Sequence, residues 1–215
     1  MNHSKVNCVI FDCDGTLIDS EILCCEALCF VISLYGMSMS QEEAMAHFEG
    51  GKLADILLAT CQRIGLNASI DELEPLYRNK LEELFCEKLT PMNGAIGLLS
   101  YLEENGIDYC IASNGPKDKI EESLKLTGLI KYFNGKVYSA FEANSWKPEP
   151  DLIQYSAMNM GYSLRECLYI DDTPKGVEAG LRAGVRTLQL IGSYTQQSNG
   201  DAIRISNLTQ AIEYL

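Results

Sequence analysis

Histidine and the basic residues are scarce in this sequence. The 215 residues include only His3 and His47, so a zinc site built from histidines and closely paired cysteines is not expected. Lys and Arg number 17 against 30 Asp and Glu, which gives a formal net charge of -13 at pH 7. Such an acidic surface repels polyphosphate backbones and anionic lipids. We therefore expect neither nucleic acid nor a membrane among the partners.

Long apolar stretches are also missing. No run approaches the roughly 18 apolar residues of a membrane-spanning helix, and the N-terminal segment is too brief for a signal peptide. The nine cysteines are an odd number and lie mostly in apolar runs. This distribution is typical of buried thiols in a reducing compartment and unlike a disulfide framework. We expect a cytoplasmic protein without disulfides.

The composition that is present suits a folded globular protein. Hydrophobic residues make up 47% of the chain and charged residues 22%, close to the average for soluble domains. The chain is longer than a typical single domain. One core domain with a smaller appendage is therefore expected.

Short apolar runs that end in polar residues recur along the chain, and we interpret them as strands. The predicted strands are 6–11, 107–112, 136–139, 167–170 and 185–190. Helical patterns between them cover 95–105, 117–127, 150–160 and 174–183. This alternation predicts an α/β fold with a doubly wound parallel sheet, that is, a Rossmann-like core.

The segment from about 18 to 88 interrupts the alternation. It reads as four successive helices, 21–34, 41–48, 53–64 and 70–86, separated by glycine-containing segments that include Gly50 and Gly51. We expect an inserted α-helical cap domain, 17–88, in a core made of 1–16 and 89–215. Because the insert follows the loop of the first strand, we expect it over the carboxyl edge of the sheet, where doubly wound folds bind ligands.

Two carboxylates stand one residue apart in the segment DCDGT, directly after the first predicted strand. In a loop, Asp12 and Asp14 can face the same small volume, which is costly without a cation. One acid can attack phosphorus while the other carries protons, as covalent carboxylate catalysis requires. The alternative is a solvated turn, because Asp and Gly are common turn residues.

This segment resembles the first motif, DxDGT, of the haloacid dehalogenase superfamily. The resemblance implies a phosphatase that uses Mg2+. It assigns Asp12 as the nucleophile and Asp14 as the acid/base. Both would also contact the metal, Asp14 through its backbone carbonyl.

Three further positions match later motifs of the superfamily, in the same order along the chain. Ser113 ends a predicted strand where the superfamily places a Ser or Thr that binds the phosphoryl oxygens, and Asn114 extends this substrate-binding patch. Lys147 matches the catalytic lysine that neutralises the phosphoryl group and the nucleophile. Asp171 and Asp172 match the acids that bind Mg2+, directly or through water.

Each of these matches also has a purely structural interpretation. Residues 113–115 suit an ordinary strand-to-helix turn, and Lys147 stands before a proline that announces a helix. Residues 171–174 suit a helix N-cap. The four motifs nevertheless occur in the required order. The resemblance therefore covers essentially the whole chain.

The helical insert has the position of the cap in the phosphoglycolate phosphatase and beta-phosphoglucomutase branch of the superfamily. Within that branch the sequence resembles small sugar-phosphate phosphatases, a group that includes enterobacterial 6-phosphogluconate phosphatase. Where the mutases carry a His on the first cap helix, this chain has Cys24, which argues against a mutase. Lys52 is the nearest cation to a basic cap position of the branch. We expect Lys52 to bind substrate, with a solvated helix residue as the alternative.

The sequence thus predicts a magnesium-dependent phosphatase that hydrolyses a small phosphorylated metabolite through an aspartyl-phosphate. A sugar phosphate or sugar-acid phosphate is expected, with 6-phosphogluconate as the leading candidate. A sugar-phosphate mutase and a non-catalytic binding protein on the same fold are the alternatives. We expect a monomer or a weak homodimer. Which of Asp171 and Asp172 ligates the metal directly stays open.

Overall fold

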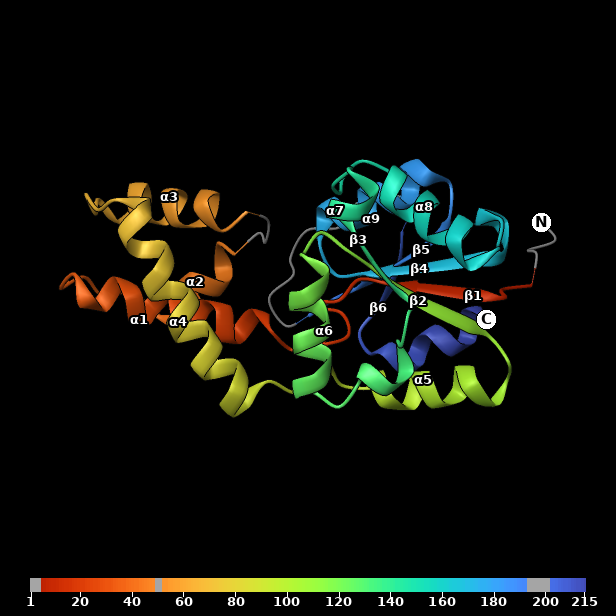
Figure 1. Cartoon of the computed structure of the whole chain (residues 1–215). Coiled ribbons are helices and arrows are strands. Elements are labelled where there is room, and N and C mark those ends of the chain that lie inside the picture. Colours follow the sequence, from red (N-terminus) through yellow and green to blue (C-terminus); the bar gives the residue numbers. More distant parts are fainter. Residues whose placement is uncertain (1–4, 49–51, 193–201) are drawn as a thin grey trace. The chain divides into compact units, whose positions relative to one another are not determined.

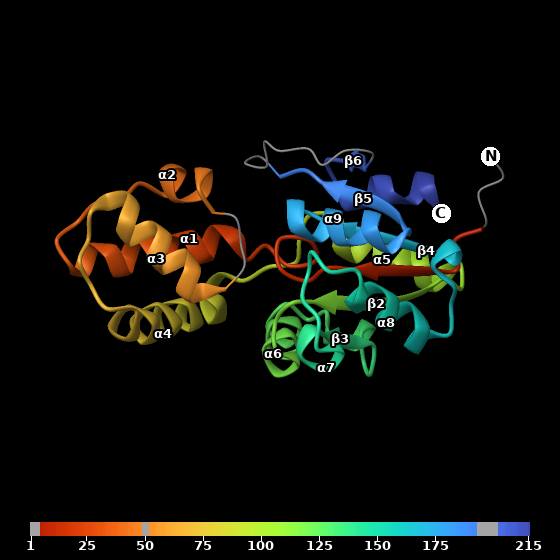
Figure 2. The ribbon, with the colours of Figure 1, turned by 90° about the horizontal axis from the view of Figure 1, so that it is seen from above.

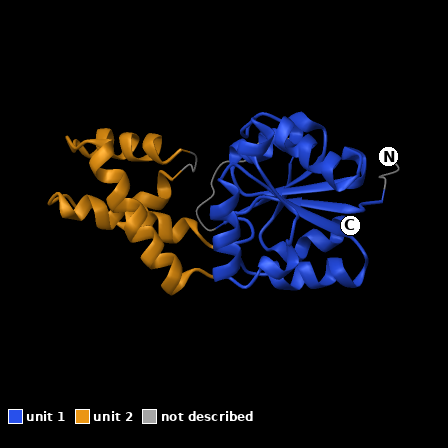
Figure 3. Cartoon of the chain, viewed as in Figure 1, with its two compact units in different colours: residues 1–18, 91–215 blue, residues 19–90 orange. Residues whose placement is uncertain are grey.

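The computed structural model of the chain describes residues 5–48, 52–192 and 202–215 (Figure 1). These residues form two compact units, one made of 1–18 and 91–215 and the other of 19–90 (Figure 3). The unit boundaries fall after residues 18 and 90, whereas the sequence pattern placed them after residues 16 and 88. Each unit is described separately below.

The first unit is built around a parallel sheet. Among the described residues, six strands lie in the order β3-β2-β1-β4-β5-β6, and every neighbouring pair is parallel. The strands are β1 (Cys8–Phe11), β2 (Asp108–Ser113), β3 (Val137–Ser139), β4 (Cys167–Asp171), β5 (Arg186–Leu190) and β6 (Ile203–Ile205). The predicted α/β class with a doubly wound parallel sheet is confirmed.

Helices cover both faces of this sheet. In Figures 1 and 2, α8 (Asp151–Met160) and α9 (Pro174–Ala183) lie on one face, and α5 (Ala95–Glu104) and the 3-10 helix η3 (Leu208–Tyr214) lie on the other. Every residue of β1 and β4 is therefore buried. This burial on both faces explains why these strands appear in the sequence as continuous apolar runs. The remaining helical segments of this unit are α6 (Lys117–Leu126), η1 (Ile130–Tyr132), α7 (Ala140–Ala143) and η2 (Leu164–Glu166).

The second unit is helical. Its helices are α1 (Glu21–Leu34), α2 (Gln41–Ala46), α3 (Leu53–Ile64) and α4 (Ile70–Lys88). Helix α1 packs against α2 and α4, and α3 packs against α4. Every observed boundary lies within two residues of the predicted one. Glu49, Gly50 and Gly51, which include the glycines expected before α3, lie outside the described residues.

The chain enters and leaves the helical unit at one place. Ile18 forms an isolated antiparallel bridge with Pro91. One residue further along each segment, the backbone N–H of Asp19 donates to the carbonyl of Thr90 at 3.0 Å. These contacts hold the outgoing and returning segments side by side.

Some short elements were not predicted. Strand β6 has three residues, and its pairing with β5 completes one edge of the sheet. Helix α7 is a single turn that begins with a capping box between Ser139 and Glu142. Both elements are shorter than the window over which hydrophobic periodicity can be recognised.

The cysteines are free thiols. All nine lie in the described ranges, and six of them are buried. The described helices also include none with the length and apolar character that crossing a membrane requires.

Candidate active site

The carboxyl ends of neighbouring strands bring predicted site residues together. β1 lies beside β4 in the sheet (Figure 1). Their register sets Phe11 level with Ile170. The backbone N–H of Asp12 donates to the carbonyl of Ile170 at 2.9 Å, so Asp12 leaves β1 beside the last residue of β4, Asp171. Residues from the first and fourth motifs therefore meet at one edge of the sheet.

Lys147 brings a positive charge to these acids. Its side chain is buried, and its Nζ lies 2.5 Å from Oδ1 of Asp12 and 2.8 Å from Oδ2 of Asp171. It also lies 3.2 Å from the hydroxyl of Tyr169. Because an ammonium group has three N–H donors, these contacts can use all of them. The structure thus joins the lysine of the third motif to acids of the first and fourth.

Asp171 is held by donors at both of its oxygens. Oδ1 accepts from the backbone N–H and from the hydroxyl of Thr173, both at 2.8 Å. Oδ2 accepts from Lys147 and from the hydroxyl of Tyr169, the latter at 2.5 Å. A Cβ at Gly176 would lie 1.8 Å from this carboxylate, so the first turn of α9 needs glycine there. The surrounding chain therefore fixes the orientation of Asp171.

Asp172 packs against the loop that follows β1. The hydroxyl of Thr16 donates to Oδ1 of Asp172 at 2.6 Å. Gly15 has a φ of +76°, and a Cβ there would lie 2.4 Å from Oδ2 of Asp172. Both its backbone conformation and this close approach require glycine. Gly15 and Thr16 of the first motif thus fix the position of Asp172 in the last motif.

Three buried acids form a group that suits a metal ion. Side-chain oxygens of Asp12, Asp171 and Asp172 lie within 4.8 Å of one another. Within the cluster, the ammonium of Lys147 cannot balance three carboxylates, and buried uncompensated charge is costly. Oxygen ligands of this kind are those that Mg2+ prefers. The residues therefore fit a magnesium ion, while the side chain of Asp14 is exposed next to them.

Burial and charge act in opposite directions on the central pair. Burial raises the pKa of the Asp12 carboxyl to about 7, although Lys147 acts to lower it. Burial also opposes the charged form of Lys147, but Asp12 and Asp171 raise the pKa of the lysine above its ordinary value. Lys147 is therefore an ammonium at neutral pH and favours the ionised form of Asp12.

Ser113 and Asn114 lie at the end of β2. Ser113 is buried, and its hydroxyl accepts from the backbone N–H of Gly115 at 3.2 Å. The side chain of Asn114 accepts from the backbone N–H of Lys147 at 2.9 Å and donates to the carbonyl of the same residue at 3.4 Å. Asn114 therefore holds the main chain of the lysine. The roles of Ser113 and Asn114 in substrate binding remain predictions.

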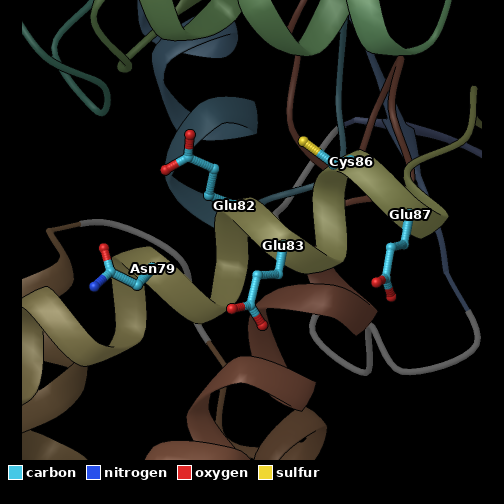
Figure 4. A pocket seen from close by; sticks show the side chains of 5 residues that line it. All are labelled: Asn79, Glu82, Glu83, Cys86 and Glu87. Atoms are coloured by element: carbon cyan, nitrogen blue, oxygen red, sulfur yellow. The ribbon is translucent and has the colours of Figure 1, made fainter.

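Lys52 belongs to the helical unit, where it is exposed and precedes α3. Its contact with substrate remains a prediction. A pocket of the same unit is shown in Figure 4, and the side chains that line it all come from α4: Asn79, Glu82, Glu83, Cys86 and Glu87. Three glutamates repel an anionic phosphate ester. We therefore do not assign this pocket to the substrate.

Two residues of the site were not predicted from sequence. Tyr169 was interpreted only as part of an apolar strand, and Thr173 only as part of a helix N-cap. Tyr169 stands two residues before Asp171, and this spacing places both side chains on the same face of a strand. That spacing was the available signal.

The chain is similar to known proteins over most of its length. The family model described as "Haloacid dehalogenase-like hydrolase" matches residues 9–190, a range that contains all four motifs. The 6-phosphogluconate phosphatase of Escherichia coli (strain K12) is 33% identical over 182 residues, which are 85% of this chain and 81% of that relative. Hexitol phosphatase A of the same strain is 30% identical over 183 residues, covering 83% of this chain and 80% of the relative.

A solved structure shows the same fold. The crystal structure of a haloacid dehalogenase-like protein of unknown function from Agrobacterium tumefaciens str. C58 superposes with a TM-score of 0.83. It is 28% identical, and the match covers 97% of this chain and 98% of that chain. The similarity therefore extends over the sheet and the helical insert alike.

Proposed function

Because the chain belongs to the haloacid dehalogenase-like hydrolase family, we propose that it hydrolyses the phosphate ester of a small sugar or sugar acid. The observation that carries this proposal is the buried ammonium of Lys147 between Asp12 and Asp171. A phosphoryl group can approach a nucleophilic carboxylate only where cations compensate for the negative charges. Lys147 supplies such a cation at the oxygen of Asp12.

The first half of the reaction is assigned to Asp12 and Asp14. An oxygen of Asp12 attacks phosphorus, the bond from phosphorus to the ester oxygen breaks, and an aspartyl-phosphate forms. Asp14, in its protonated form, gives its proton to the departing alkoxide. Lys147 stabilises the charge on the phosphoryl oxygens, and Ser113 is proposed to bind one of them.

The second half releases phosphate. A water molecule attacks the phosphorus of the aspartyl-phosphate while the Asp14 carboxylate takes its proton. The bond between phosphorus and the Asp12 oxygen breaks, so inorganic phosphate leaves and the Asp12 carboxylate is restored. The exposed side chain of Asp14 supports this role, because a proton carrier must reach both the leaving group and water.

Magnesium completes the proposed site. Asp12, Asp171, Asp172 and the backbone carbonyl of Asp14 would hold the ion, directly or through water. When bound, the ion supplies positive charge that screens the carboxylates from an anionic substrate. Asp172 is the more suitable direct ligand, because each oxygen of Asp171 already accepts two hydrogen bonds.

The names of the relatives support this substrate class, since 6-phosphogluconate is a sugar-acid phosphate and a hexitol phosphate is the ester of a related sugar alcohol. We propose 6-phosphogluconate as the first compound to test. Its carboxylate also gives the exposed ammonium of Lys52 a partner of opposite charge. The free thiols support the proposal that the protein works in the reducing cytoplasm.

The function can be tested by measuring phosphate release from sugar phosphates, sugar-acid phosphates, phosphoglycolate and nucleotides in the presence of Mg2+. We expect the highest kcat/KM for a sugar or sugar-acid phosphate, without any bisphosphate activator. Asp12→Asn protein, prepared in the same way, controls for contaminating phosphatases. Isomerisation of a sugar phosphate without release of phosphate would instead identify a mutase. A lack of both reactions would contradict the proposal.

A further inference from the structure

Tyr169 is a polar residue in the middle of the sheet. It lies in the central strand β4 and is wholly buried. Its side chain shares a face of the strand with that of Asp171, because the two residues are two positions apart. A buried tyrosine hydroxyl needs hydrogen-bond partners. Here the partners are charged groups of the active site.

The hydroxyl contacts both members of an ion pair. It donates to Oδ2 of Asp171 at 2.5 Å and lies 3.2 Å from Nζ of Lys147. A hydroxyl has one hydrogen, so donation to the carboxylate leaves its lone pairs to accept from the ammonium. The Tyr169 hydroxyl therefore restrains the acid and the lysine together.

The ammonium of a lysine must be held in place if it is to stabilise charge at one particular atom. Its ammonium sits on a flexible stem with four carbons, and a single contact would leave its direction open. Three groups, those of Asp12, Asp171 and Tyr169, lie within hydrogen-bond distance of Nζ of Lys147. The tyrosine is the uncharged contact of the three, so it directs the ammonium without adding negative charge to an already acidic site. Loss of this hydroxyl would leave one N–H of the lysine without its acceptor.

The neighbouring helix leaves room for the tyrosine ring. A Cβ at Gly180, in α9, would lie 2.6 Å from Cδ1 of Tyr169 and 2.4 Å from the hydroxyl oxygen of Thr187. Glycine weakens the interior of a helix, so its presence there needs a reason. The close approach of the ring is part of that reason. Gly180 and Tyr169 therefore form a matched pair.

We propose that Tyr169 is a positioning residue for phosphoryl transfer, which directs the Lys147 ammonium toward Asp12 from a seat provided by Gly180. This inference rests on the proposed function and adds a residue outside the four motifs. Tyr169 acts through Lys147 and does not touch the substrate. Its hydroxyl is therefore expected to affect the chemical step more than substrate binding.

The test removes the hydroxyl and keeps the ring. Tyr169→Phe is compared with Tyr109→Phe, because Tyr109 is also buried in a strand, and its hydroxyl donates to a carboxylate, that of Glu103, at 3.0 Å. We expect Tyr169→Phe to lower kcat about tenfold and to leave KM within about twofold of wild type. Tyr109→Phe is expected to leave kcat and KM within about twofold. Thermal unfolding of both variants shows whether their folds are equally stable.

A double-mutant cycle tests the matched pair. Gly180→Ala should lower kcat in the wild-type background by displacing the ring, but should lower it little further in Tyr169→Phe, where the hydroxyl is already gone. Additive losses of kcat would count against the role of Gly180 as the seat of this ring.

Several outcomes overturn the inference. These are a kcat of Tyr169→Phe within about twofold of wild type, equal losses of kcat in both Phe variants, or a Tyr169→Phe protein that does not fold. The first outcome shows that the lysine works without the hydroxyl, the second that the loss is not specific to Tyr169, and the third that the hydroxyl serves the fold. If the wild-type chain releases no phosphate from any substrate, the proposed function fails and this inference fails with it. If the wild type is active and Tyr169→Phe is equally active, the inference is wrong but the proposed function is unaffected.

Discussion

The hydroxyl of Thr16 donates to Oδ1 of Asp172 at 2.6 Å and so joins two residues that are 156 positions apart in the sequence. The bond connects the loop after β1 to the loop after β4. Both residues are buried, so the hydrogen bond is shielded from water. The donor fixes one oxygen of Asp172 and thereby sets the direction of the other.

Thr16→Val should raise the Mg2+ concentration for half-maximal activity by about tenfold, because an acid that loses its orienting donor holds a metal less well. The measurement is a Mg2+ titration of phosphate release. Thr127→Val is the control, since that hydroxyl donates to the carbonyls of Ser123 and Leu124, both in α6. An unchanged Mg2+ requirement in Thr16→Val would show that Asp172 does not depend on this bond.

Chelation with EDTA should abolish activity, and added Mg2+ should restore it, because Asp12, Asp171 and Asp172 otherwise repel an anionic substrate. Full activity of metal-free protein would disprove the magnesium site.

Asp172→Ala should raise the Mg2+ concentration needed for half-maximal activity more than Asp171→Ala does. The reason is that both carboxylate oxygens of Asp171 already accept hydrogen bonds from the protein.

Asp12→Asn should lower phosphate release by more than about a thousandfold, since an amide cannot form the acyl-phosphate. The circular dichroism spectrum should not change, because the two side chains have nearly the same shape. Asp118→Asn, at an exposed position in the first turn of α6, should keep full activity. Substantial residual activity in Asp12→Asn would assign the nucleophile to another residue.

Asp14→Asn should affect substrates according to their leaving groups. We expect kcat/KM for an alkyl phosphate to fall by about a hundredfold or more, because the alkoxide loses its proton donor. For p-nitrophenyl phosphate the loss in kcat/KM should be much smaller, since nitrophenolate leaves without a proton. The ratio kcat/KM is compared because it reports the steps up to formation of the aspartyl-phosphate. Equal losses for both substrates would exclude Asp14 as the general acid.

Lys52→Ala should raise KM about fivefold or more for a phosphorylated sugar acid and leave KM for p-nitrophenyl phosphate within about twofold. The reason is that the ammonium can pair with a carboxylate at the far end of the first substrate, whereas p-nitrophenyl phosphate has no such group. Lys131→Ala removes another exposed lysine and is the control. If both substrates change alike, or neither changes, Lys52 is a solvated residue.

Much of the fold could be predicted because burial leaves a trace in the sequence. β1 and β4 are buried on both faces and appear as apolar runs, and the amphipathic helices between strands end at positions marked by glycine, such as Gly161 and Gly184. β6 left no such trace. It has three residues, of which Arg204 is exposed, and its place is set by pairing with β5.

The acids of the site were predictable for a different reason. The resemblance to a known family assigned Asp12, Lys147 and Asp171 to one site. The structure gives a physical reason for the meeting of the two acids, because both follow parallel strands at the same carboxyl edge. Two features were missed. The spacing places Tyr169 on the same strand face as Asp171 but does not tell its hydroxyl from that of a core tyrosine. The contact of Asn114 with Lys147 joins positions 33 residues apart without a periodic signal.

The bridge between Ile18 and Pro91 means that residues 19–90 begin and end at adjacent positions of the core. A segment whose two ends are already adjacent can grow at small cost, because the entropy of loop closure rises slowly with length. The strand pairings that align Asp12 with Asp171 all lie outside this segment. Evolution can therefore lengthen, shorten or exchange the helical unit while the sheet stays unaltered, so that new preferences can arise in this lineage without rebuilding its chemistry.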